Sequence, residues 1–178
     1  MCSPLNTSVL EQLLGPEATW EPCDPLERIP RDRSLVRDPS GDGLTMRFFR
    51  RPEAPHLVAK AWFGPGAEGP PSHAHGGAIM AVLDEAMGAA VWAEGHAVVL
   101  ARFTIDLKAM VPLLQVALAE AWVECVDGRK IEARGRLIGA DGLDHAHCHG
   151  LFIAIGTERF DRLNDVSGEG RPSSETPP

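Results

Sequence analysis

The stretch that decides the fold is Pro70–Gly95, PPSHAHGGAIMAVLDEAMGAAVWAEG, the longest apolar segment of the chain. From Gly77 onward, large apolar side chains surround the expected helix axis, and alanines fill the gaps between them. A helix that is apolar all round is a buried one, so this segment is predicted to form the centre of the core. Asp84 and Glu85 lie in its middle. Burying a carboxylate costs roughly several kcal/mol unless it is paired or hydrogen-bonded, so at least one of them needs a specific structural or functional reason.

The front end of the predicted helix is His75-Gly76-Gly77, preceded by prolines that keep the chain extended. A helix N-terminus has unpaired N–H donors and the positive end of the helix dipole, so it can receive a carbonyl oxygen that acquires negative charge. Asp84 follows Gly77 by about two helical turns and therefore lies on nearly the same side. One helix face is predicted to carry oxyanion donors and a carboxylate.

The pattern Pro-Pro-x-x-x-His-Gly-Gly-Ala-x-x-x-x-x-Asp-Glu-x-x-Gly over residues 70–88 resembles the hotdog-fold acyl-CoA thioesterases of the phenylacetate-pathway and thioesterase-superfamily-member type. The resemblance covers roughly residues 43–156. It implies that Gly76 supplies an oxyanion N–H and that Asp84 is the nucleophile or general base. It also implies a water-positioning hydroxyl or amide, for which the stretch Leu100–Thr104 offers no clear equivalent.

Each of these residues has an alternative interpretation. Without the motif, Asp84 is slightly more typical of an acid paired with a neighbouring Arg, and the motif shifts the balance to catalysis. Glu85 is expected to make a structural contact, with a partner subunit or with the loop. His75 is a candidate general acid or base, although holding the loop by hydrogen bonds is the favoured role.

Composition restricts the class of partner. A formal charge of −8 argues against nucleic acid, whose binders carry a basic surface. Acyl-CoA is also polyanionic, so local cations would have to overcome the overall field. The predicted substrate-binding residues are Gly77, Arg102 and Lys108, with Lys60, Lys130, Arg134 and Arg136 also available. No metal or redox cofactor is implied.

The N-terminal sequence lacks a basic segment followed by a long apolar run, so neither a signal peptide nor a membrane span is expected. Four widely spaced cysteines show no metal-ligand spacing. The predicted location is cytoplasmic.

The expected fold is α+β, a hotdog domain with an antiparallel sheet of about six strands around one long helix. Alternating segments predict strands on both sides of the helix, and Asp127-Gly128 and Asp141-Gly142 predict hairpins. Three regions are expected. Residues 1–42 form a helix and a Pro-rich coil packed on the body, 43–156 the hotdog domain, and 157–178 a polar, disordered tail.

Three histidines alternate in DHAHCHG, at His145, His147 and His149, and would share one face of a strand. A pair could hold a metal ion, but no carboxylate or further histidine is obviously placed to complete the shell. A solvent-facing or interface row is favoured over a metal site.

The predicted function is hydrolysis of acyl-CoA or related thioesters to free acid and thiol. The alternative is a non-hydrolytic acyl-CoA-binding or regulatory hotdog protein. Self-association as a homodimer or homotetramer is expected. The resemblance implies a site built from two subunits, and a single six-stranded sheet would expose long edges.

Overall fold

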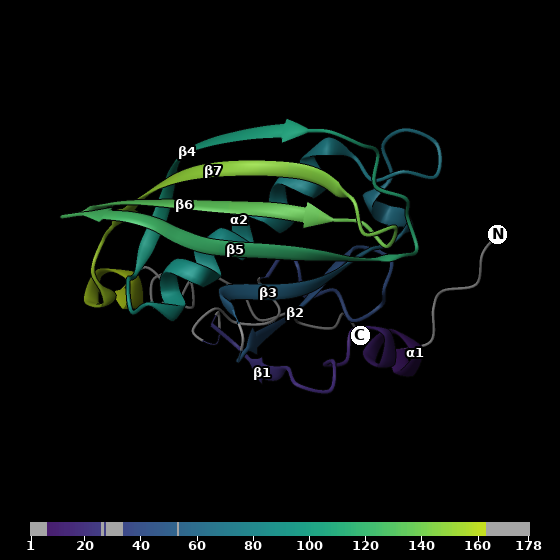
Figure 1. Cartoon of the computed structure of the whole chain (residues 1–178), viewed down its shortest axis with the longest axis horizontal. Coiled ribbons are helices and arrows are strands. Elements are labelled where there is room, and N and C mark those ends of the chain that lie inside the picture. The colour runs from purple at the N-terminus through teal and green to yellow at the C-terminus, as the bar shows by residue number, and fades with distance from the viewer. Residues whose placement is uncertain (1–6, 26, 28–33, 53, 163–178) are drawn as a thin grey trace, which may run out of the picture.

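The computed structural model describes residues 7–25, 27, 34–52 and 54–162. A seven-stranded antiparallel sheet, in the order β1-β2-β3-β5-β6-β7-β4, wraps around one long helix, α2, which spans Gly76–Ala93 (Figure 1). The α+β hotdog prediction is confirmed. The strands are β1 (Glu21–Cys23), β2 (Leu44–Arg51), β3 (Ala54–Phe63), β4 (Val98–Leu107), β5 (Val116–Asp127), β6 (Lys130–Ile138) and β7 (Asp144–Ala154).

The apolar composition of α2 follows from its place inside the curved sheet. Val82, Leu83, Met87 and Val91 have no exposed surface, and they lie in one core with residues of β2 to β7. By length and composition alone α2 could cross a membrane, and burial under the sheet accounts for the same composition. The helix ends before Gly95, whose φ of 90° suits a residue without a Cβ.

The strands after α2 form the hairpins that their alternation predicts. In β6, Ile131, Ala133 and Leu137 are fully buried, whereas Glu132, Arg134 and Arg136 alternate with the buried positions. Gly128 joins β5 to β6 with φ 56°, and Gly142 joins β6 to β7 with φ 79°. Because β4 pairs with β7 alone, it forms one open edge of the sheet.

The N-terminal segment differs from the expected helix and coil. The helix α1 (Thr7–Leu13) is present, and Leu10 packs against Trp62 on the outer face of β3. The prediction of coil is wrong at Glu21–Cys23, which pair with β2 as the edge strand β1. This short strand raises the count from about six to seven. With Pro22 in its middle it has no alternating pattern to reveal it.

The C-terminal boundary is also shifted. Residues 157–162, predicted to belong to a disordered tail, are helical. Phe160 contacts Trp92 edge to face, with ring centroids 4.7 Å apart, so aromatic packing on α2 fixes this turn. The rest of the predicted tail, residues 163–178, lies outside the described residues.

Candidate active site

His75 is the N-cap of α2. Its ring Nδ1 accepts a hydrogen bond from the N–H of Gly77 at 2.9 Å, and the backbone N–H of His75 donates to Ala67 O at 2.8 Å. This is the loop-holding role favoured for His75, and a proton-transfer role stays a prediction. This cap corrects the prediction that Gly77 binds substrate. The Gly77 N–H already donates to His75 and is not free to donate to a substrate.

Gly76 is the first residue of α2, and its N–H has no intrahelical acceptor. Within the described part of the chain, no other acceptor is recorded for it. A Cβ at Gly76 would lie 3.3 Å from Leu107 Cδ1, so this side of the helix start faces the end of β4. Gly76 therefore supplies the free N–H that the oxyanion-hole prediction requires.

Asp84 lies in the middle of α2. Gly88, one turn further along, faces Phe152 of β7, which sets the direction of this helix face. Asp84 is partly buried, and desolvation raises the pKa of its carboxyl. Among the residues that the structure describes, none forms a hydrogen bond or ion pair with it. An acid that is desolvated and unpaired is typical of a functional group rather than of a structural one.

Two sulfur atoms pack beside this face. The Cys148 thiol lies 3.6 Å from Met87 Sδ in the core. Burial raises the pKa of Cys148 to about 12, and the nearby charge of Asp84 adds to the rise. A thiol with this pKa is neutral, so Cys148 places no second negative charge near Asp84. Alternation along β7 indicates this inward position, opposite to the histidines.

Glu85 points to the other side of the helix, because adjacent residues are about 100° apart. Burial raises the pKa of Glu85, the charge of Asp84 raises it further, and the Arg37 guanidinium opposes both. Arg37 is nearly buried and forms an ion pair with Asp24. Glu85 therefore lies within reach of the charge of the N-terminal segment, whereas a contact with a partner subunit or with the loop stays a prediction. No pattern in the Pro-rich stretch marks Arg37 as its partner.

The distance along α2 limits what one chain can do. Gly76 and Asp84 are eight residues apart, which corresponds to about 12 Å along the axis. The prediction that they share a side of the helix stays a prediction. A hydrogen bond to one carbonyl oxygen reaches only about 3 Å. Within one chain, this N–H and this carboxylate cannot act on the same thioester.

The cations that were candidates for substrate binding fall into two groups. Lys60, Arg134 and Arg136 form ion pairs with Glu17, Glu124 and Glu120 at 2.5–2.7 Å. Arg102 on β4 and Lys108 just after it are exposed, and in the described ranges neither has a recorded ion pair. The two cations predicted to bind substrate are thus available, and they lie at the β4 edge.

The larger cavities lie elsewhere. One of about 440 Å³ is lined by residues around β1 and β2, including Cys23, Arg37 and Phe48. Another, of about 430 Å³, is lined from β3, β5, β6 and β7 by residues such as His56 and Trp122. Neither includes Gly76 or Asp84.

The histidine row does have carboxylates beside it, contrary to expectation. His145 Nε2 lies 3.0 Å from Asp141, and His147 Nε2 lies 2.7 Å from Asp144. His149 Nε2 lies 3.5 Å from Glu132 and 4.0 Å from Glu124. These acids come from turns and neighbouring strands, so their proximity depends on strand register.

Comparison with known proteins gives consistent results. Residues 72–144 match the family model of the thioesterase superfamily. The acyl-coenzyme A thioesterase THEM4 of Xenopus laevis is 32% identical over 119 residues, which cover 66% of this chain and 54% of the relative. The chain spans about half the length of the curated relatives it matches.

Solved structures agree with the fold. One thioesterase superfamily protein has a TM-score of 0.57 at 27% identity, covering 61% of this chain and 53% of that chain. A Streptococcus mutans UA159 protein bound to acetyl CoA has a TM-score of 0.60 at 15% identity, covering 74% of this chain and 96% of that chain. The matched motif segment, the sheet order and these relatives show that the chain is similar to thioesterase superfamily proteins in its motif and in its fold.

Proposed function

We propose that this protein is an enzyme that hydrolyses acyl-CoA thioesters to a free acid and coenzyme A. The observation that carries the proposal is Asp84, a partly buried and unpaired carboxylate on the helix that begins with the free N–H of Gly76. The THEM4 relatives, which are named acyl-coenzyme A thioesterases, support the same activity.

In the proposed reaction, Asp84 acts as nucleophile or as base. As a nucleophile, its carboxylate adds to the thioester carbon, the C–S bond breaks, and the thiolate leaves and takes a proton from water. A water molecule then hydrolyses the resulting anhydride and restores Asp84. As a base, Asp84 removes a proton from the water whose oxygen adds to the thioester carbon, the C–S bond then breaks, and the leaving thiolate takes that proton from Asp84. In both routes the Gly76 N–H stabilises the carbonyl oxygen while it is negative.

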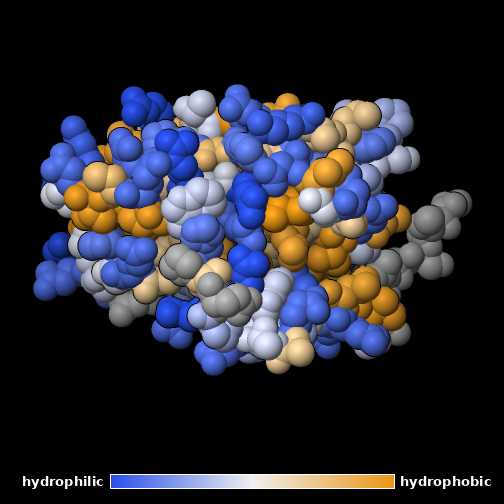
Figure 2. Space-filling view, viewed as in Figure 1, coloured by the Kyte–Doolittle hydropathy of each residue, from blue (hydrophilic) through white to orange (hydrophobic). Residues whose placement is uncertain are grey.

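We further propose that the site forms between two copies of the chain. The separation of about 12 Å between Gly76 and Asp84 requires a donor from a second copy. Strand β4 is an edge strand with unused hydrogen-bonding groups along one side, and Val99, Leu107 and Met110 on and after it are largely exposed. Apolar patches also interrupt the hydrophilic surface viewed in Figure 2. A homodimer through β4 is the proposed minimum, and a homotetramer would pair two such dimers.

The proposed ligand is acyl-CoA. Arg102 and Lys108 would meet its phosphates at the β4 edge, where the chain keeps two exposed cations despite its net charge of −8. The acetyl CoA bound to the Streptococcus mutans protein of the same fold supports this class of ligand.

We also propose that the protein acts in the cytoplasm. Cys23, Cys125 and Cys148 are free thiols, as is usual in a reducing compartment. Fractionation of cells that express the full chain, followed by immunoblotting, tests this proposal. Recovery outside the cytoplasmic fraction would contradict it.

One observation favours a second candidate function, acyl-CoA binding without turnover. Within the described ranges, Asp84 has no recorded polar partner that would orient a water molecule. Incubation of the full chain with a panel of acyl-CoA substrates, with detection of the free thiol, separates the two functions. Thiol release that Asp84→Asn abolishes supports hydrolysis, whereas calorimetric binding of acyl-CoA with no thiol release supports the binding protein.

A further inference from the structure

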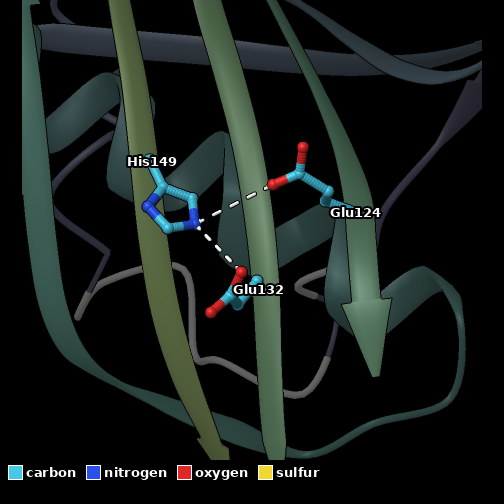
Figure 3. Close-up of side chains that lie close together, drawn as sticks. All are labelled: Glu124, Glu132 and His149. Atoms are coloured by element: carbon cyan, nitrogen blue, oxygen red, sulfur yellow. Dashed lines mark ion pairs between the residues drawn. The ribbon is translucent and has the colours of Figure 1, made fainter. Parts of the chain in front are cut away.

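Three side chains from three neighbouring strands converge on the outer face of the sheet. They are Glu124 of β5, Glu132 of β6 and His149 of β7, and their ligand atoms lie within 4.8 Å of one another (Figure 3). The cluster is separate from the candidate active site. Ala133 and Cys148, the neighbours of Glu132 and His149, are buried on the α2 side, so the cluster faces away from α2.

The distances in the cluster are unlike those of hydrogen bonds. His149 Nε2 lies 3.5 Å from Glu132 Oε2 and 4.0 Å from Glu124 Oε2, beyond the usual 2.7–3.2 Å. Two ligand atoms that each lie about 2.1 Å from one tetrahedral Zn²⁺ are separated by about 3.4 Å. The separation of 3.5 Å is close to this value, and the three ligand atoms, which lie within 4.8 Å of one another, would move closer together around one ion.

The burial of the histidine nitrogen is a second observation. The Nε2 atom of His149 is buried from solvent and has no hydrogen-bond partner. A buried ring nitrogen normally finds one, because leaving it unsatisfied costs about 1–3 kcal/mol. In Figure 3 this nitrogen points toward the two carboxylates.

A β-bulge and a neighbouring Arg orient the carboxylate of Glu124. The pairing of β5 with β6 shifts between Val123 and Cys125, which leaves Glu124 as the extra residue of a β-bulge, and bulges redirect side chains. Arg134 Nε donates to Glu124 Oε1 at 2.5 Å, so Oε2 remains for an ion. An outer hydrogen bond of this kind orients a metal ligand.

We propose that Glu124, Glu132 and His149 bind one Zn²⁺ per chain, with water as the fourth ligand. A histidine and carboxylates are ordinary zinc ligands, and the two acids offset the charge of the ion. The ion would link β5, β6 and β7 on the outer face and stabilise the folded state. This proposal does not depend on the proposed thioesterase activity.

The test is calorimetric titration of ZnCl₂ into the tag-free full chain after treatment with chelator. We expect one ion per chain, together with a higher melting temperature, because a ligand that binds only the folded state stabilises it. Glu132→Gln and His149→Ala should each weaken binding about tenfold or more. His147→Ala is the matched control, because His147 lies on the same face of β7 but is paired with Asp144, and it should leave binding unchanged.

Three results would overturn the proposal. The first is the absence of saturable zinc binding. The second is equal loss of binding in His147→Ala and His149→Ala. The third is loss of binding in Cys125→Ser, because Cys125 lies opposite Glu132 in the strand register and its exposed thiol is itself a possible zinc ligand.

Discussion

The two sides of α2 place a carboxyl group in different surroundings. Asp84 and Glu85 are adjacent, and burial raises the pKa of both. On the side of β4 and β7, no cation is recorded near Asp84 within the described residues. On the other side, Arg37 from the N-terminal segment partly offsets the burial of Glu85. Residue type therefore does not separate an acid without a nearby cation from one beside a cation, and the segment packed against each side of the helix does.

The largest expected effect is on turnover. Asp84→Asn is nearly isosteric and should preserve the fold and acyl-CoA binding, while kcat falls by several orders of magnitude through loss of the nucleophile or base. Glu85→Gln is the matched control and should retain most of kcat. Thiol release by both variants on one active substrate measures the contrast. Loss of activity in Glu85→Gln but not in Asp84→Asn would reverse the roles assigned to the two sides.

A smaller effect is expected from the edge of the sheet that borders the Asp84 side. Leu107→Glu places a charge beside Gly76 and the exposed edge of β4, and it should weaken self-association at least tenfold, with a parallel loss of kcat/KM. Leu13→Glu on α1 is a control of similar exposure, 42% against 50%. Light scattering measures the mass. A wild-type particle of only 19.2 kDa at micromolar concentration would refute the two-copy site.

On the Glu85 side we expect an effect on stability alone. Arg37→Met removes the cation that opposes the desolvation of Glu85 and breaks the ion pair with Asp24. Because Asp24 is partly exposed, the expected loss is about 2 kcal/mol, below that of a fully buried pair. This corresponds to a melting temperature lower by about 5 °C. Arg47→Met on β2 is the control, and an equal loss there would remove the special role of Arg37.

The smallest effect concerns pH. A carboxyl whose pKa is raised by folding opposes folding above that pKa, and the penalty is relieved as pH falls through it. Asp84→Asn should therefore melt slightly above wild type at pH 7, and the difference should shrink toward pH 4. Glu85→Gln should also melt above wild type at pH 7, because the burial cost and the repulsion from Asp84 that it removes exceed the lost attraction of Arg37. Melting curves that show no gain for either variant at pH 7, or a gain that does not shrink toward pH 4, would contradict this expectation.

The main fold was predictable because its signals are local. The all-apolar segment after Gly77 predicts α2, and the two Asp-Gly turns predict the hairpins that follow. The separation of Gly76 from Asp84 was also predictable, since eight residues of helix are longer than one thioester. Strand β1 and the orientation of Arg37 were not predictable, because tertiary pairing alone defines them. The carboxylates beside His149 depend on the register of three strands and on a bulge, which no short pattern specifies.

The separation of Gly76 from Asp84 has a genetic consequence. In the proposed dimer each chain gives its acid to one site and its N–H to the other. A chain with Asp84→Asn and a chain with Gly76→Pro, which removes the N–H at a helix position where proline is well accommodated, would both be inactive alone. Mixed dimers would contain one site with both defects and one intact site. Two inactive alleles would then complement each other, with up to about half of the activity restored in each mixed dimer.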